Sequence, residues 1–211
     1  MSENLLEGVR HLKQSTIRIQ RDRTIYFDPF GIEGKPKDAD IIMISHSHYD
    51  HFSLKDIKKL VKENTLLVLP EDCVKDAEEV GYTNVFTVVP SKKYEIEGLK
   101  FSTVPAYNMN KRFHRKESKW VGYIVKIDHA DYYFAGDTDL IPEMKDIRAD
   151  VVFLPVGGTY TMTSAEAVEA ANIISPKIAV PIHFADVVGN RADAEHFVKE
   201  IDPSIQGVIL K

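Results

Sequence analysis

The spacing of hydrophobic positions along this chain changes repeatedly between the two-residue period of strands and the 3.6-residue period of helices. Short runs rich in β-branched residues, such as Ala39–Ser45 and Val151–Leu154, are typical of buried strands. Apolar residues at helical spacing follow Ser53 and Thr163, and an acidic residue stands three positions after each, which predicts a helix cap at both. The pattern therefore indicates a chain of mixed α and β structure.

The predicted strands form two groups, each followed by strand–helix units, and no linker rich in Pro, Gly or Ser divides the chain. Strands are expected at 16–20, 24–28, 39–45, 65–69, 84–89, 94–97, 99–105, 121–128, 132–135, 151–154, 178–181 and 206–210, and helices at 53–61, 71–80, 163–174 and 191–201. Two groups of strands with helices suggest two packed sheets covered by helices. We expect an α/β (α+β) fold, a four-layer α/β/β/α sandwich, in a single domain over residues 1–211.

Composition narrows the class of protein. With 211 residues, 44% hydrophobic and 28% charged, the chain resembles a globular domain. It contains no apolar stretch long enough to span a bilayer, and its first residues lack the apolar core of a signal peptide, so we expect a cytoplasmic protein without a membrane partner. The single cysteine, Cys73, cannot form an internal disulfide. Any metal site must therefore be built from His and carboxylate side chains.

The net charge of −5 argues against a nucleic-acid partner, because phosphate contacts need a concentrated basic surface. One stretch, residues 111–119, differs, and we call it the basic loop. Its basic side chains are Lys111, Arg112, His114, Arg115, Lys116 and Lys119. Two interpretations stay open: a solvated charged loop, or a lid that attracts an anionic substrate.

The strongest chemical signal is the run His46-Ser47-His48-Tyr49-Asp50-His51. His46 and His48 are two positions apart at the end of a predicted strand, so their side chains point to the same side and can share one ion. Asp50 and His51 lie between that strand and the next helix, where the chain can turn and offer two further ligands. A chain of this composition contains such a pattern by chance roughly once in a thousand cases. The run predicts a site for Zn²⁺, with Mn or Fe as alternatives.

This run resembles the signature of the metallo-β-lactamase superfamily, and further segments extend the likeness over most of the chain. They are Asp28-Pro29-Phe30, Gly136-Asp137-Thr138-Asp139, Leu154-Pro155-Val156-Gly157-Gly158-Thr159-Tyr160 and Ile182-His183-Phe184. They are similar to the compact branch that includes L-ascorbate-6-phosphate lactonase and metal-dependent hydrolases. The resemblance implies that Asp137 bridges two metals and that His183 binds the second. Asp28 is either an acceptor for a metal-bound imidazole or a strand-ending Asp before Pro.

The chain departs from the superfamily pattern at one point. The superfamily places a further His ligand after the strand near position 105, where this chain reads Val104-Pro105-Ala106-Tyr107-Asn108. His114 lies on the basic loop and is either a substitute ligand or an exposed loop His. Without it, the first site keeps only His46, His48 and Asp137.

From these residues we expect a hydrolase that uses a metal-bound hydroxide on a small, anionic ester, lactone or phosphodiester, with one or two zinc ions. Asp50 would bind metal and orient the water, and the candidate donors to the developing oxyanion are Tyr107, Asn108, His114 and Tyr160. Two alternatives are an RNA-processing metallo-nuclease and a metal-binding protein without turnover. The expected partner is a small-molecule substrate, and a homo-oligomer is compatible with the sequence.

Overall fold

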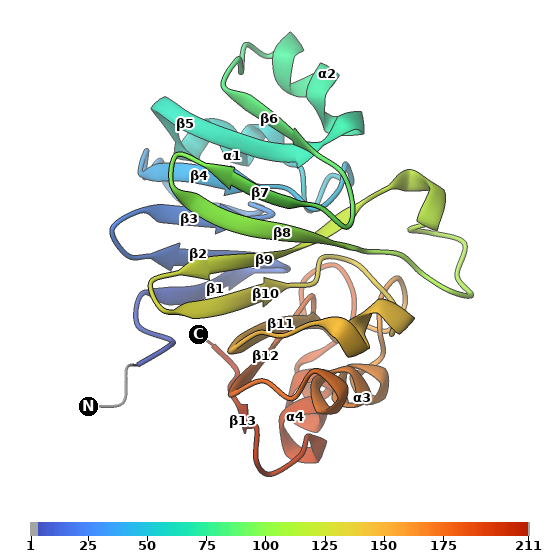
Figure 1. The fold of residues 1–211 in the computed structure, drawn as a ribbon. Coiled ribbons are helices and arrows are strands. Elements are labelled where there is room, and N and C mark those ends of the chain that lie inside the picture. The colour runs from blue at the N-terminus through green and yellow to red at the C-terminus, as the bar shows by residue number, and fades with distance from the viewer. Residues whose placement is uncertain (1–3, 211) are drawn as a thin grey trace. The chain divides into compact units, whose positions relative to one another are not determined.

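The computed structural model describes residues 4–210 and is shown in Figure 1. Its internal contacts divide the chain into two compact units, the first ending at Val88 and the second covering Val89–Leu210. Each unit is built on one β-sheet. The expectation of a single domain over 1–211 stays a prediction.

The first unit contains a mixed sheet of six strands in the order β1-β2-β3-β4-β5-β6. Strands β1 to β3 pair antiparallel, and β3 to β6 pair parallel. The strands are β1 (Val9–Lys13), β2 (Thr16–Gln20), β3 (Thr24–Phe27), β4 (Ala39–Met43), β5 (Val61–Pro70) and β6 (Val85–Val88). Because β3, β4 and β5 run parallel, their carboxyl ends open at the same edge of the sheet.

Two helices belong to this unit, α1 (Leu54–Leu60) and α2 (Glu71–Glu79). The predicted cap of α1 is confirmed, because the Ser53 side chain accepts a hydrogen bond from the backbone N–H of Asp56. One apolar cluster joins α1 and the sheet through buried Ile42, Ile57 and Leu67. Because this face of α1 is buried against the sheet, the position of the segment between β4 and α1 is fixed. This segment carries the His signature.

The second unit contains a mixed sheet of seven strands in the order β13-β12-β11-β10-β9-β8-β7. Strands β7 to β10 pair antiparallel, and β10 to β13 pair parallel. The strands are β7 (Lys93–Ile96), β8 (Leu99–Pro105), β9 (Val121–Ile127), β10 (Ala130–Phe134), β11 (Val151–Pro155), β12 (Ile178–Ile182) and β13 (Gln206–Gly207). The arrangement of two mixed sheets with accompanying helices confirms the predicted fold class.

Helices α3 (Ser164–Ile174) and α4 (Arg191–Glu200) lie beside strands β11 to β13 in Figure 1. They share one apolar cluster with the sheet, in which Val152, Ala170 and Phe197 are fully buried. Short 3-10 turns are η1 (Lys116–Ser118) and η2 (Pro142–Asp146). Thr163 forms the predicted capping box with Glu166 at the start of α3. Among residues 4–210, no helix has both the length and the apolar character needed to cross a bilayer.

The structure differs from the sequence prediction mainly at the sheet edges. Strand β1 was not predicted, because Val9–Lys13 is largely polar and pairs only with β2. Strand β5 begins four residues early, at Val61, where an irregular pairing with β4 carries exposed side chains. The closing strand expected at 206–210 pairs with β12 only over Gln206–Gly207. At these places pairing with a neighbour, rather than an apolar pattern, defines the strand.

Candidate metal centre

In the first unit, the signature residues follow the carboxyl end of β4, where the chain leaves the sheet before α1. His46 and His51 are buried and His48 is partly buried. The Nε2 atom of His46 lies 3.1 Å from Nδ1 of His48, and the rings of His46 and His51 are 4.0 Å apart between centroids. The prediction that His46 and His48 point to the same side is confirmed.

Asp28, at the end of the neighbouring strand β3, contacts His51 directly and His46 through Ser45. Its fully buried carboxylate accepts hydrogen bonds from His51 Nδ1 (2.7 Å), from the backbone N–H of Ser45 (2.7 Å) and from the Ser45 hydroxyl. The Ser45 hydroxyl is also 2.8 Å from His46 Nδ1. Burial raises the pKa of Asp28, and the contacts with His51 and Ser45 act in the opposite direction. A proton held at Nδ1 of His51 leaves its Nε2 lone pair for a metal.

The donor set of the first unit fits a cation. One potential ligand atom from each of Asp28, His46 and His51 lies within 4.8 Å of the others, and all three residues are buried. Because Asp28 accepts the hydrogen bond from Nδ1 of His51, we assign it to the support of the ligands, and His51 keeps Nε2 for a cation. Asp50, also buried, accepts a hydrogen bond from Gln14 Nε2 at 3.1 Å and lies 3.4 Å from His51 Nε2. Sequence reasoning did not find Gln14, and no motif around it signals this role.

In the second unit, Asp137 follows β10 and His183 follows β12. Oδ2 of Asp137 lies 3.2 Å from Nε2 of His183 and 3.3 Å from Nε2 of His114, and all three residues are buried. The structure thus brings His114 to the carboxylate and excludes the interpretation of an exposed loop His. Two imidazoles and a shared carboxylate are ligand types that suit Zn²⁺ or Fe.

Three of these residues have backbone conformations that are uncommon outside glycine. The φ angles are 43° for Asp28, 54° for His114 and 58° for His183. Such conformations cost free energy in an L residue and persist where surrounding contacts impose them. The contacts of Gly157 illustrate this packing, because a Cβ added there would lie 2.5 Å from the carbonyl oxygen of His183. Glycine at this position lets the backbone approach His183 closely.

The predicted oxyanion donors have different surroundings. Tyr107 is a buried residue, and its hydroxyl donates to Glu143 Oε2 at 2.9 Å. Nδ2 of Asn108 donates to two carbonyl oxygens, those of Phe113 (3.1 Å) and Tyr160 (2.7 Å). Tyr160 is partly exposed, with its ring edge-to-face with Phe113. The oxyanion role of these residues stays a prediction, and Tyr160 is the most exposed of the three.

The basic loop is less available to an anion than its composition suggests. Lys111 forms an ion pair with Asp139, and Lys116 forms one with Glu143. Because His114 is buried at Asp137, the exposed basic side chains left without such a pairing are Arg112, Arg115 and Lys119. Part of the basic composition therefore serves internal contacts.

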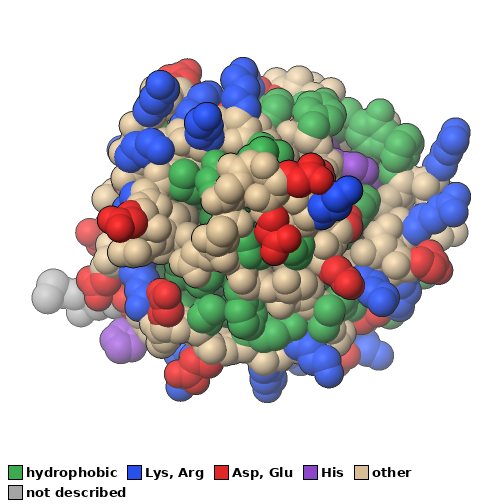
Figure 2. Space-filling model, turned by 90° about the horizontal axis from the view of Figure 1, so that it is seen from above, with side chains coloured by type: hydrophobic (Ala, Val, Ile, Leu, Met, Phe, Trp, Pro, Cys, Tyr) green, Lys and Arg blue, Asp and Glu red, His purple; other side chains and the backbone are tan. Residues whose placement is uncertain are grey.

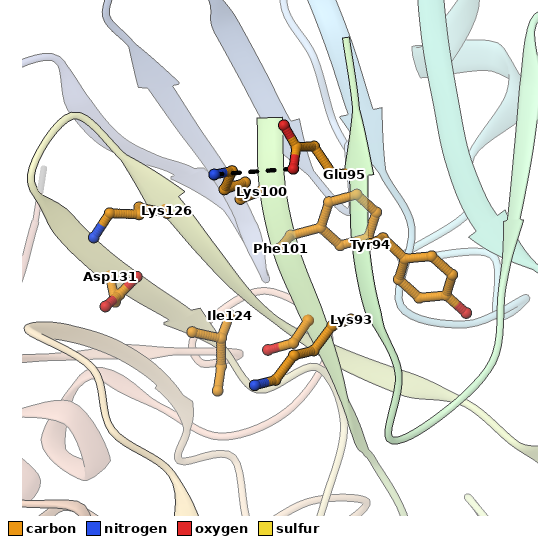
Figure 3. A pocket seen from close by; sticks show the side chains of 9 residues that line it. Lys93, Tyr94, Glu95, Lys100, Phe101, Ile124, Lys126 and Asp131 are labelled. Atoms are coloured by element: carbon orange, nitrogen blue, oxygen red, sulfur yellow. Dashed lines mark ion pairs between the residues drawn. The ribbon is translucent and has the colours of Figure 1, made fainter. Parts of the chain in front are cut away.

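One pocket of the second unit lies apart from these ligands, on strands β7 to β10 (Figure 3). It has a volume of about 500 Å³ and is lined by Lys93, Tyr94, Glu95, Lys100, Phe101, Ser102, Ile124, Lys126 and Asp131. Lys100 and Glu95, which face each other on the paired strands β8 and β7, form an ion pair in its lining at 3.9 Å. Its lining includes no predicted site residue and no His or Cys. The His and Asp clusters are therefore the better candidates for a metal centre.

Comparison with known proteins shows the family to which the chain belongs. A family model described as a β-lactamase superfamily domain matches residues 9–183, which include the signature, Asp137 and His183. The chain belongs to the metallo-β-lactamase superfamily. Within this superfamily it belongs to the UPF0173 metal-dependent hydrolase family. The member from Methanopyrus kandleri is 32% identical over 208 residues, covering 89% of each chain. A member from Pyrococcus horikoshii is 30% identical and covers 96% of each chain.

Solved structures agree with this family assignment. A crystal structure described as a metal-dependent hydrolase from Parabacteroides distasonis is 29% identical, with a TM-score of 0.78, and covers 96% of this chain and 91% of that one. A metallo hydrolase from Ignicoccus hospitalis, 20% identical with a TM-score of 0.79, shares the fold. The predicted metallo-β-lactamase fold is thereby confirmed.

Proposed function

We propose that this superfamily member is a hydrolase that activates water with one or two divalent cations and acts on a small ester, lactone or phosphodiester. The observation that carries the proposal is the Asp137 carboxylate, whose Oδ2 lies 3.2 and 3.3 Å from the Nε2 atoms of His183 and His114. Two imidazoles that direct Nε2 at one carboxylate oxygen are an arrangement that a cation stabilises. The names of the relatives, metal-dependent hydrolases, support the same class.

The proposed ligands divide into two sets that share Asp137. The first cation would be held by His46, His48, His114 and Asp137, and the second by Asp50, His51, Asp137 and His183. Imidazole nitrogen and carboxylate oxygen suit zinc best, with manganese or iron as alternatives. The buried acceptor Asp28 supports His51 as a ligand, because a metal-binding imidazole usually donates its other N–H to such a group.

A bound divalent cation supplies Lewis acidity, which makes water a nucleophile near pH 7 and polarises the attacked bond. Within the chain, Asp28 keeps the Nδ1 proton of His51 and so fixes its tautomer. Gln14 holds the Asp50 carboxylate, which would accept the proton of the attacking water. The Tyr160 hydroxyl is our candidate donor to the oxygen on which negative charge develops.

A small molecule is the substrate class that the charges favour. The face drawn in Figure 2 carries Lys and Arg side chains interspersed with Asp and Glu, not one large basic patch. The net charge of −5 for the whole chain agrees with a small-molecule substrate, because binding to RNA would need a concentrated basic surface. Arg112, Arg115 and Lys119 remain exposed on the basic loop and would suffice to attract a small anion.

The experiment is hydrolysis by the purified protein of a panel of esters, lactones and phosphodiesters, with metal content measured in parallel. The double variant D50A/H51A should lose turnover and retain its fold by circular dichroism. The matched control H129A/H196A removes two exposed histidines and should keep full turnover. Turnover retained in D50A/H51A would refute the proposal. Metal without turnover on any substrate would favour a non-catalytic metal protein, and salt-sensitive binding of single-stranded RNA would favour the nuclease alternative.

A further inference from the structure

The segment that delivers His114, residues 107–114, contains no helix or strand. Its conformation is therefore not imposed by a ladder of backbone hydrogen bonds. His114 is nevertheless buried, has a φ of 54° and directs Nε2 at Asp137. A strained residue in an irregular segment keeps one position only when surrounding contacts hold it there.

Asp139 contacts this segment at three points. Its backbone N–H donates to the carbonyl of Tyr107 at 3.0 Å, its Oδ2 accepts from the backbone N–H of Met109 at 2.9 Å, and its Oδ1 pairs with Lys111 Nζ. Lys111 Nζ also donates to the carbonyl of Thr161 at 2.9 Å. The exposed fractions of the two charged side chains are 24% for Lys111 and 8% for Asp139, so water screens their interaction little.

Contacts of Asn108 close the segment at His114. Its backbone N–H donates to the His114 carbonyl at 2.7 Å, and its side chain donates to the carbonyls of Phe113 and Tyr160. Asp137 and Asp139 belong to one loop, between β10 and η2. The loop whose Asp137 carboxylate contacts His114 therefore also binds, through Asp139, the segment that carries His114.

We propose that Lys111 and Asp139 are positioning residues, whose partly buried ion pair holds His114 at Asp137 and so completes a metal site that lacks a histidine near position 105. The inference rests on the proposed function. It also assigns Lys111 a different role from attracting substrate, because its ammonium group is engaged by Asp139 and by the Thr161 carbonyl.

The test is a titration of the metal-free protein with Co²⁺, whose visible absorption reports the ligands, and with Zn²⁺, whose stoichiometry is counted. Lys111→Met should weaken the site that includes His114 by about 10- to 100-fold and leave the other site unchanged. Lys111→Arg should restore most of the affinity, because it restores the charge. Lys116→Met is the matched control: it removes a paired cation from the same loop, but one whose side chain is 59% exposed. It should bind both ions within about twofold of the parent protein.

A double-mutant cycle distinguishes positioning from a general effect on folding. In a His114→Ala background, Lys111→Met should cause no further loss of metal affinity, because the ligand it positions is already absent. If Lys111→Met does not fold, Asp139→Asn provides the same comparison, since it removes the charge of the pair and keeps an acceptor for Met109. Unchanged affinities in the folded variant would overturn the inference while leaving the proposed function intact. A parent protein that binds neither metal would overturn both.

Discussion

Asp28→Asn is the substitution with the most specific expected effect. The Asp28 carboxylate is fully buried and accepts three hydrogen bonds, one of them from Nδ1 of His51 at 2.7 Å. An amide of the same shape has one acceptor oxygen and one NH₂ group. If the oxygen remains at the backbone N–H of Ser45, the NH₂ group faces His51 and drives its proton to Nε2. The imidazole then cannot bind metal through Nε2.

The magnitude follows from the two interactions that are lost. Removing the partner that orients a metal-binding imidazole weakens metal affinity by about 10- to 100-fold, or about 1.4–2.7 kcal/mol. The hydrogen bonds to a buried carboxylate contribute about 1.5–3 kcal/mol each to stability, and part of this is lost as well. The variant should therefore fold less stably and bind metal more weakly.

The assay is competition for Zn²⁺ with a chromophoric chelator, together with urea denaturation of the metal-free protein. Asp38→Asn is the control, because Asp38 also accepts two side-chain hydrogen bonds in the first unit, from Arg18 and Tyr26, and does not contact the signature. It should lose some stability and no metal affinity. If Asp28→Asn binds zinc as tightly as the parent protein, the reasoning about the His51 tautomer is wrong.

Three further substitutions have defined outcomes. Burial raises the pKa of Asp56, but hydrogen bonds, chiefly from Lys59, outweigh burial and lower the pKa overall. Asp56→Asn should therefore lower the free energy of unfolding by about 1–3 kcal/mol at pH 7. Urea denaturation should show this difference vanishing as the pH falls from about 4 through the depressed folded-state pKa. The Tyr133 hydroxyl is fully buried with no hydrogen-bond partner among the described residues, so Tyr133→Phe should leave the melting temperature unchanged or raise it, and a clear decrease would contradict this. Gly157→Ala forces the His183 backbone to move. Chemical denaturation should show a free energy of unfolding lower by about 1–3 kcal/mol, and zinc binding should be weaker. Wild-type values for both would show that the contact is not tight.

Much of the fold was predictable, because the spacing of hydrophobic residues and the residues that cap helices are local signals. Strand β8 begins and ends where the pattern predicted, and Ser53 and Thr163 cap the expected helices. Strand β1 escaped prediction because its pairing with β2, and not its apolar content, makes it a strand. Pairing partners at a sheet edge are a property of the folded chain and leave little trace in a single sequence.

The sequence indicated the candidate ligands, whose role stays a prediction, and gave little sign of the contacts that hold them. The signature spacing indicated His46, His48, Asp50 and His51, and the resemblance indicated Asp137 and His183. The place of His114 depends on the contacts of an irregular segment with Asp139, which sequence spacing does not encode. Gln14 lies 36 positions from the Asp50 carboxylate that it holds, and no local pattern connects the two.

We propose that ligands from both units bind the same cations, and anomalous diffraction from crystals of the freshly purified protein would show whether they do. Data collected on either side of the zinc, iron and manganese absorption edges identify the element and locate each ion. We expect one or two ions, with His51 and His183 nitrogens at about 2.0–2.1 Å from the same ion and Asp137 as a shared ligand. An ion bound by residues of only one unit, or no metal signal at these histidines, would contradict it.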